Sequence, residues 1–289
     1  MSHTVDLGEA QIHYAEAPGP GPALVLLHGI TGSHAAFLPL LPALADCAHV
    51  YLPDLRGHNL SGRTPGAYQV QDYGSDIVTF VKQVVGRPAL LAGHSMGGMI
   101  AMWVAAQAPE WVRGVFLEDP SLYIFRLARL QETWFYGVFT VLREQLREHH
   151  AQGGTLDDLI APVGQWPANA QQTMLEAAGP EAVRLKATEL HRMDPTVMDV
   201  ALAGDFLGSY DPDVLLAQLR CPAQLLAGEV PYGGAMSAED VQRFLTQVPH
   251  AVHTVFEGVG HMIHDERPEE YAHALREFLT ALPAQPTRA

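Results

Sequence analysis

Short apolar runs alternate with amphipathic segments over the first 120 residues of the chain. Two short strands are expected between Val5 and Ala15, with a turn at Gly8-Glu9, and the later runs that have the length of a buried strand are 23–27, 49–53, 88–92 and 112–117. Helical spacing of apolar residues separates several of these runs, as in Tyr73, Ile77, Phe80, Val81 and Val84. This alternation predicts an α/β fold, with a mostly parallel central sheet flanked by helices.

The alternation stops between Ser121 and about Gly208. This stretch is rich in helix formers and aromatic residues, is interrupted at Gly153-Gly154 and Gly179-Pro180, and contains no run typical of a strand. We therefore expect residues 121–208 to form a helical cap inserted over the strand ends. Residues 1–120 and 209–289 would then form the core domain.

The strand and helix pattern returns after the insertion. We expect a strand at 223–227, a loop at 229–240 and a further strand at 254–256, with helices at 211–219, 241–248 and 268–282. His261 lies in a glycine-bordered loop between the last strand and the last helix. Sites in parallel α/β sheets gather at the carboxyl ends of the strands, so this loop is a candidate for the site.

The segment Gly93-His94-Ser95-Met96-Gly97 joins an apolar strand to a run of good helix formers. Such a turn strains the serine backbone, and glycines on either side let the strand and the helix approach closely. The Met96 N–H begins the helix and can donate to a developing anion. The segment matches neither the dinucleotide nor the phosphate-loop glycine motif. We interpret it as a nucleophile turn, with a flexible glycine turn as the alternative.

Composition narrows the partners. Seventeen basic and 32 acidic residues give a net charge of −15, which disfavours nucleic acid and anionic lipid surfaces. No segment approaches the length of a membrane span, and no secretory signal is recognised, so a cytoplasmic location is expected. Cys47 and Cys221 favour free buried thiols over a disulfide framework, although a single bridge stays open. The histidine pairs His149-His150 and His261-x-x-His264 lack further ligands, so no metal or other cofactor is expected.

The motifs together resemble those of the α/β-hydrolase superfamily over essentially the whole chain. The matching segments are His28-Gly29, Asp54-Leu55-Arg56-Gly57-His58, Gly93-His94-Ser95-Met96-Gly97-Gly98 and Gly260-His261. The resemblance implies that Ser95 is the nucleophile and His261 its general base and later acid. It also implies that the N–H groups of Ile30 and Met96 form the oxyanion hole. A serine at position 95 argues against the dehalogenase and epoxide-hydrolase routes of relatives that carry aspartate there.

Two positions depart from the pattern of the superfamily. Asn59 stands where relatives have glycine, and asparagine tolerates a left-handed backbone. Pro231 stands where relatives commonly carry the acid that orients the histidine. Some relatives place that acid at the end of the strand after the nucleophile helix, and there this chain has Asp119. We expect Asp119 to be the orienting acid, with Glu229 as the alternative.

The function implied is that of a cofactor-free serine hydrolase. It would cleave a small to medium carboxylic ester, thioester or lactone through an acyl-enzyme, with a small molecule as its partner. A carbon–carbon bond hydrolase of the same fold would use the same residues. A ligand sensor that keeps the pocket without turnover is an alternative of another class. The sequence indicates neither the natural substrate nor the oligomeric state.

Overall fold

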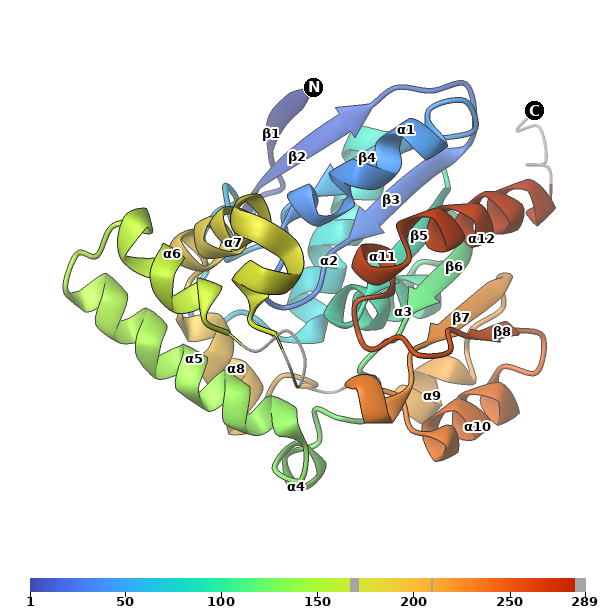
Figure 1. The fold of residues 1–289 in the computed structure, drawn as a ribbon. Helices are drawn as coiled ribbons and strands as arrows, with labels where there is room; N and C mark the ends of the chain where they lie inside the picture. The colour runs from blue at the N-terminus through green and yellow to red at the C-terminus, as the bar shows by residue number, and fades with distance from the viewer. Residues whose placement is uncertain (167–171, 209, 284–289) are drawn as a thin grey trace.

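The computed structural model describes residues 1–166, 172–208 and 210–283 (Figure 1). The strands are β1 Ser2–Asp6, β2 Gln11–Ala17, β3 Ala23–Leu27, β4 His49–Pro53, β5 Ala89–His94, β6 Val112–Glu118, β7 Ala223–Ala227 and β8 Val252–Val255. The helices are α1 Leu41–Leu44, α2 Val70–Phe80, α3 Met96–Gln107, α4 Leu127–Leu130, α5 Trp134–Ala151, α6 Leu156–Gly164, α7 Met174–Arg192, α8 Thr196–Ala203, α9 Pro212–Leu216, α10 Ala238–Gln247, α11 Ile263–Glu266 and α12 Pro268–Ala281.

The strands form one sheet in the order β1-β2-β4-β3-β5-β6-β7-β8. β2 pairs antiparallel with β1 and with β4, and the neighbours from β4 to β8 are parallel. Central strand β5 is buried along its whole length, as expected for a strand covered on both faces. The predicted α/β fold with a mostly parallel sheet is confirmed.

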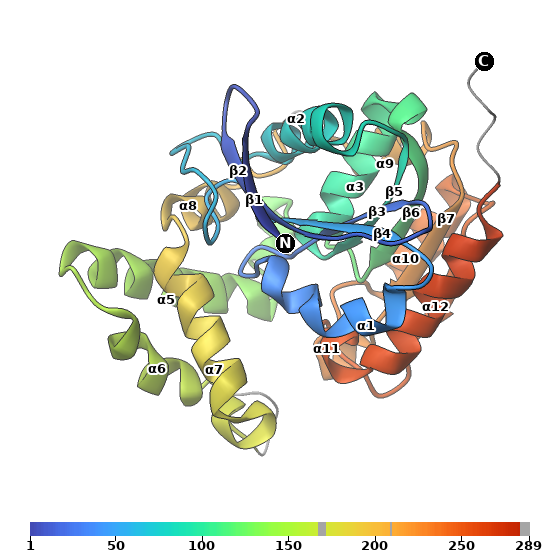
Figure 2. The same cartoon turned by 90° about the horizontal axis from the view of Figure 1, so that it is seen from above.

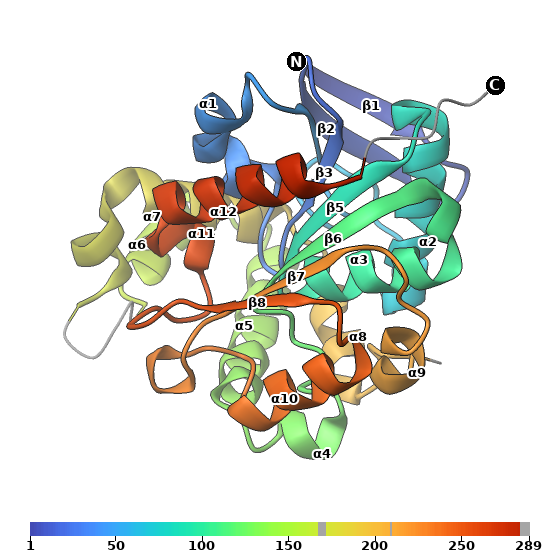
Figure 3. The same cartoon turned by 90° about the vertical axis from the view of Figure 1, so that its right-hand side faces the viewer.

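Helices cover both faces of the sheet. α2, α3 and α9 lie on one face, and α1, α11 and α12 lie on the other (Figure 2). A view toward the β8 edge shows α10 on the same side as α3, opposite α12 (Figure 3). The two faces carry separate apolar clusters, one around Tyr73, Ile100 and Phe244 and the other around Phe37 and Tyr271. The sheet is therefore the middle layer of three.

Local chemistry explains where the elements differ from the prediction. The expected helix before residue 45 is a 3-10 helix, His34–Leu40, followed by the short α1, because Pro39 interrupts the α-helical hydrogen bonds. α10 begins inside the expected loop 229–240, where Ser237 and Asp240 form a capping box. β8 covers Val252–Val255, two residues before the expected start.

Helices α4 to α8 come from residues 121–208. α5, α6 and α7 stand away from the sheet, beside the ends of its central strands (Figures 1 and 2). The apolar cluster is continuous from the core into this region, because Phe125 lies 4.5 Å from Phe206 and Phe206 lies 6.4 Å from Tyr73 of α2, measured between ring centroids. None of the helices in the described ranges combines the length and apolar character needed to cross a bilayer.

The turn between β5 and α3 depends on two glycines. A Cβ on Gly97 would lie 2.0 Å from the carbonyl oxygen of Leu27, and a Cβ on Gly93 would lie 2.3 Å from the backbone of Gly97. Neither distance leaves room for a methyl group, and the obstructing atoms are backbone atoms that cannot rotate away. The start of α3 therefore packs directly against β3 and β5.

We predict that Gly97→Ala destabilises the protein by at least about 2 kcal/mol, because the added methyl group overlaps a main-chain oxygen. The matched control is Gly137→Ala in α5, where nothing lies within 4 Å of the added Cβ. That change should instead stabilise the helix by about 0.5–1 kcal/mol. Urea denaturation of the two variants measures both effects, and an equal stability for Gly97→Ala and the native protein would contradict the packing described.

Candidate active site

Ser95 occupies the turn between β5 and α3 in a strained backbone conformation. Its φ of 53° and ψ of −115° lie outside the regions that serine normally adopts. The backbone N–H of Ser95 donates to the carbonyl of Glu118 at 2.9 Å, which ties the turn to the end of β6. Ser95 is only 5% exposed, yet it lines a pocket of about 980 Å³. Strain held in place by its surroundings is characteristic of functional positions.

The Ser95 hydroxyl makes its hydrogen bond to another serine. Its Oγ lies 3.1 Å from Oγ of Ser121, which directly follows Pro120 at the end of β6. His261 lines the same pocket, but within the described residues no hydrogen bond joins it to Ser95. Such bonds are often long or misaligned before a substrate binds. Ser121 was not predicted from the sequence, although its place shortly after central strand β6 was a signal for it.

Asp119 and His261 are joined directly. Nδ1 of His261 lies 2.6 Å from Oδ2 of Asp119, whose residue is fully buried. Asp119 also accepts hydrogen bonds from the backbone N–H groups of Ala235 at 2.6 Å and Gly228 at 3.4 Å. A carboxylate at Nδ1 favours the tautomer that carries its proton there and leaves Nε2 free to accept a proton.

The Glu229 carboxylate contacts the backbone of Gly258. Its Oε2 accepts the N–H of Gly258 at 2.6 Å, in the loop that precedes His261. The structure therefore brings Asp119, and not Glu229, to the imidazole. Glu229 instead fixes the loop on which His261 stands.

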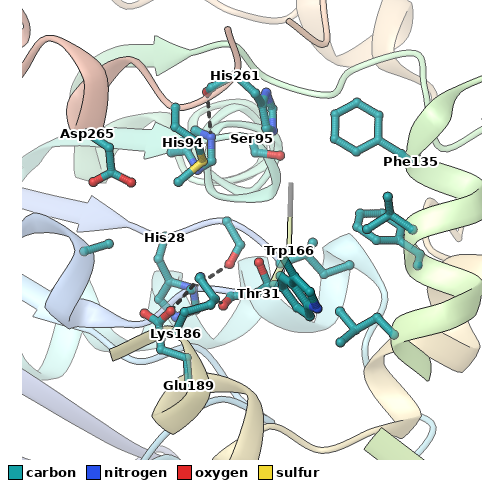
Figure 4. Close-up of a pocket in the computed structure, with 18 of the residues that line it drawn as sticks. His28, Thr31, His94, Ser95, Phe135, Trp166, Lys186, Glu189, His261 and Asp265 are labelled. Carbon is teal, nitrogen blue, oxygen red and sulfur yellow. Dashed lines mark hydrogen bonds and ion pairs between the residues drawn. The ribbon is translucent and has the colours of Figure 1, made fainter. Parts of the chain in front are cut away.

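Two buried histidines, His94 and His264, lie near His261, and His94 contacts its backbone (Figure 4). Nε2 of His94 lies 3.0 Å from the carbonyl oxygen of His261. His264 bonds to Glu118 through both its backbone N–H and its Nδ1, each at 2.8 Å from Oε1. Burial alone would lower the pKa of His264, but the charge and hydrogen bond of Glu118 outweigh it and raise that pKa. His264 is thus a buried partner of Glu118.

The two expected oxyanion donors lie on either side of the turn. Met96 is the first residue of α3, where backbone N–H groups have no carbonyl partner within the helix. Ile30 lies in the loop after β3 and lines the same pocket as Ser95. Nε2 of His58 lies 2.8 Å from the carbonyl oxygen of Ile30, and His28 receives the N–H of Leu55 at 3.0 Å. These contacts join the Ile30 loop to the loop that follows β4.

The pocket above Ser95 has a volume of about 980 Å³. The core contributes Ser95 and His261, whereas α5 and α7 contribute much of the apolar lining together with the polar side chains of Gln145, Lys186 and Glu189. The Phe135 ring packs edge-on against His261, with centroids 5.3 Å apart. The volume is at the upper end of the range for small-molecule sites.

Comparison with known proteins decides the family. Residues 24–274 match the Alpha/beta hydrolase family. The chain belongs to the alpha/beta hydrolase family. The predicted superfamily is therefore confirmed, and the chain is a hydrolase.

Individual relatives of this hydrolase differ in their named substrates. It is 36% identical over 124 residues to a 2-(acetamidomethylene)succinate hydrolase of Mesorhizobium japonicum, a match that covers 43% of this chain and 44% of that relative. It is 28% identical to a pimeloyl-[acyl-carrier protein] methyl ester esterase of Xanthomonas campestris pv. campestris, over 92% of this chain and 98% of the relative. A solved E-2-(acetamidomethylene)succinate hydrolase shares the fold with a TM-score of 0.74 and 24% identity, over 97% of this chain and 99% of the other.

One group of side chains in the hydrolase has the composition of a metal site. Among the described residues, His13, His34 and Asp54 bring their ligand atoms within 4.8 Å of one another. The Asp54 carboxylate already accepts hydrogen bonds from His13 at 2.7 Å, His34 at 2.9 Å and Asn59 at 2.8 Å. Burial alone would raise the pKa of Asp54, but these histidine contacts lower it well below its usual value. The hydrogen bonds account for the arrangement, which anchors the loop after β4.

Asn59 and the two cysteines were also singled out in the sequence. Asn59 has a φ of 44°, so it adopts the left-handed backbone that its replacement of glycine suggested. Cys47 and Cys221 are free thiols, and both are partly rather than fully buried.

We predict that the pair formed by Glu118 and His264 stabilises the hydrolase most at mildly acidic pH. Because the folded pKa of His264 is raised, its contribution is complete below the unfolded pKa of about 6.5 and is lost as the pH rises through the folded pKa. The free-energy difference between the native protein and Glu118→Gln should therefore shrink between pH 6 and pH 9. Urea denaturation at both pH values measures it, and a difference that stays constant with pH would refute the prediction.

Proposed function

We propose that this chain is a serine hydrolase that cleaves a carboxylic ester, thioester or lactone through an acyl-enzyme on Ser95. In this proposal His261 is the general base and acid, Asp119 orients it, and the N–H groups of Ile30 and Met96 bind the oxyanion. The observation that carries it is the 2.6 Å contact between His261 and the buried Asp119, in the pocket that Ser95 lines.

The proposed reaction has two halves. When a substrate enters, the Ser95 hydroxyl exchanges its bond to Ser121 for one to Nε2 of His261. Oγ attacks the carbonyl carbon as its proton passes to His261, and the oxyanion accepts hydrogen bonds from the two backbone N–H groups. His261 then gives the proton to the leaving oxygen or sulfur. In the second half, His261 takes a proton from a water molecule that attacks the acyl carbon. The bond between that carbon and Oγ then breaks, His261 gives the proton to Oγ, and the acid leaves.

In the same proposal, residues 121–208 act as a cap over the site. Support comes from α5 and α7, which supply much of the apolar lining of the pocket while the core supplies Ser95 and His261. The methyl ester named for the Xanthomonas relative supports an ester substrate. The acetamido group named for the Mesorhizobium relative makes an amide the second candidate, because an acyl-enzyme route cleaves that bond as well.

We predict that Ser95→Ala abolishes turnover of short p-nitrophenyl esters and labelling by a fluorophosphonate. Stability should change by less than about 1 kcal/mol, since the change removes one hydroxyl and leaves the apolar packing in place. Ser121→Ala is the matched control, because it removes the neighbouring hydroxyl but keeps the nucleophile, and it should retain labelling. A native protein that is never labelled, or labelling that persists in Ser95→Ala, would overturn the proposal.

We predict that Asp119→Asn lowers kcat by up to about 10⁴-fold, because an amide at this position favours the wrong histidine tautomer. Glu229→Gln is the matched control, since it removes one carboxylate charge from the loop contact with Gly258 and leaves the imidazole partner in place. Steady-state kinetics on one ester compare the two variants. A near-normal Asp119→Asn enzyme beside a crippled Glu229→Gln enzyme would show that Glu229 is the orienting acid.

A further inference from the structure

One wall of the pocket is a continuous apolar face of α5. Phe135, Val138, Phe139 and Leu142 recur at the spacing of a single helix face, and Gln145 ends the series. Phe135 lies against His261, so the wall begins at the reacting group. With a rise of 1.5 Å per residue, the ten-residue step to Gln145 extends it by roughly 15 Å. This wall is long enough for an extended chain, and it ends in an uncharged side chain.

The opposite wall carries Lys186 of α7, and its charge is balanced (Figure 4). Nζ of Lys186 lies 2.6 Å from Oε2 of Glu189, which is 4% exposed, and donates to the carbonyl of Thr31 at 2.9 Å. The other carboxylate oxygen of Glu189 accepts the hydroxyl of Ser33 at 2.8 Å. Among the described lining residues, Lys186 is the one lysine, and no arginine is present.

The histidines that line the pocket add no unbalanced positive charge. His261 is paired with Asp119, and His264 with Glu118. Burial, together with the neighbouring His58, lowers the pKa of His28 to about 3. Burial beside His261 and His264 lowers the pKa of His94 well below its usual value. These two rings are therefore neutral at physiological pH.

The charge that remains in the pocket is negative. Asp265 of α11 lines it with a side chain that is 55% exposed, and its Oδ1 lies 3.6 Å from Nε2 of His264, whose charge Glu118 already balances. The chain as a whole carries a net charge of −15, which adds to the repulsion of anions. A carboxylate that left water for this pocket would find no free cation among the described lining residues, and burying an unpaired charge is costly.

We propose that the natural acyl group is an uncharged apolar chain that lies along α5, and that the site discriminates against acyl groups bearing a carboxylate. The inference rests on the proposed hydrolysis at Ser95 and assigns its substrate class. It separates this chain from the relatives whose names specify a succinate, which has two carboxyl groups. In this proposal the shared fold binds an acyl chain whose far end is apolar, whereas a succinate ends in a carboxylate.

The experiment compares two six-carbon acyl groups on the same leaving group, p-nitrophenyl hexanoate and the mono-p-nitrophenyl ester of adipic acid. The native protein should cleave the adipate ester with a kcat/KM at least about 100-fold below that of the hexanoate ester, because only the adipate ester would bury a charge. Equal or faster cleavage of the adipate ester would overturn the inference and leave the proposed function standing. Cleavage of neither ester, with no labelling of Ser95, would remove both.

Glu189→Gln tests the charge balance itself. It leaves Lys186 without its carboxylate partner, so the preference for hexanoate over adipate should narrow by about tenfold or more. Glu181→Gln is the matched control, because Glu181 is an exposed residue of the same helix outside the pocket lining. Its preference should match that of the native protein. An unchanged preference in a folded Glu189→Gln protein would contradict the proposal, and the native comparison decides it where that variant does not fold.

Discussion

The buried carboxylate of Asp119 is the point at which the separate parts of the site meet. It stands at the end of β6, accepts two backbone N–H groups from the segment that follows β7, and contacts the imidazole on the loop after β8. A buried carboxylate without partners would be strongly destabilising, so each of these contacts is also a condition for its burial. The contacts that allow this carboxylate to be buried therefore also fix the positions of the loops, and His261 is one of its partners.

Backbone strain is concentrated at the same place. Ser95 and Asp119 both have positive φ values, 53° and 38°, which cost free energy in residues that carry a Cβ. The structure holds them with ordinary sheet hydrogen bonds. The N–H of Ser95 donates to the carbonyl of Glu118, and the N–H of Asp119 donates to that of Leu226. The centre of the sheet therefore supports two positions with strained backbone, and these hydrogen bonds link the turn at Ser95 to the end of β6, which carries Asp119.

The pocket is assembled from two sources with different chemistry. The core supplies Ser95 and His261, while α5 supplies the apolar wall and α7 supplies the ion pair of Lys186 and Glu189. Under the proposed charge preference, similarity of fold to a succinate hydrolase carries little information about the acyl group, because the apolar wall and the ion pair lie on α5 and α7 rather than on the sheet.

The sequence by itself determined the sheet, the strained turn at Ser95 and the family, because these depend on local signals. Apolar runs, glycine spacing around Ser95 and the alternation of strand and helix are all readable within short windows. Only the tertiary structure decided which carboxylate meets His261, since Asp119 and Glu229 both stand at strand ends and differ only in where the loops carry them. The sequence could not predict three further features for the same reason. These are the hydrogen bond between Ser95 and Ser121, the side chains around Asp54 and the charge balance of Lys186. Their partners come from distant segments, and their contacts follow from packing rather than from any local pattern.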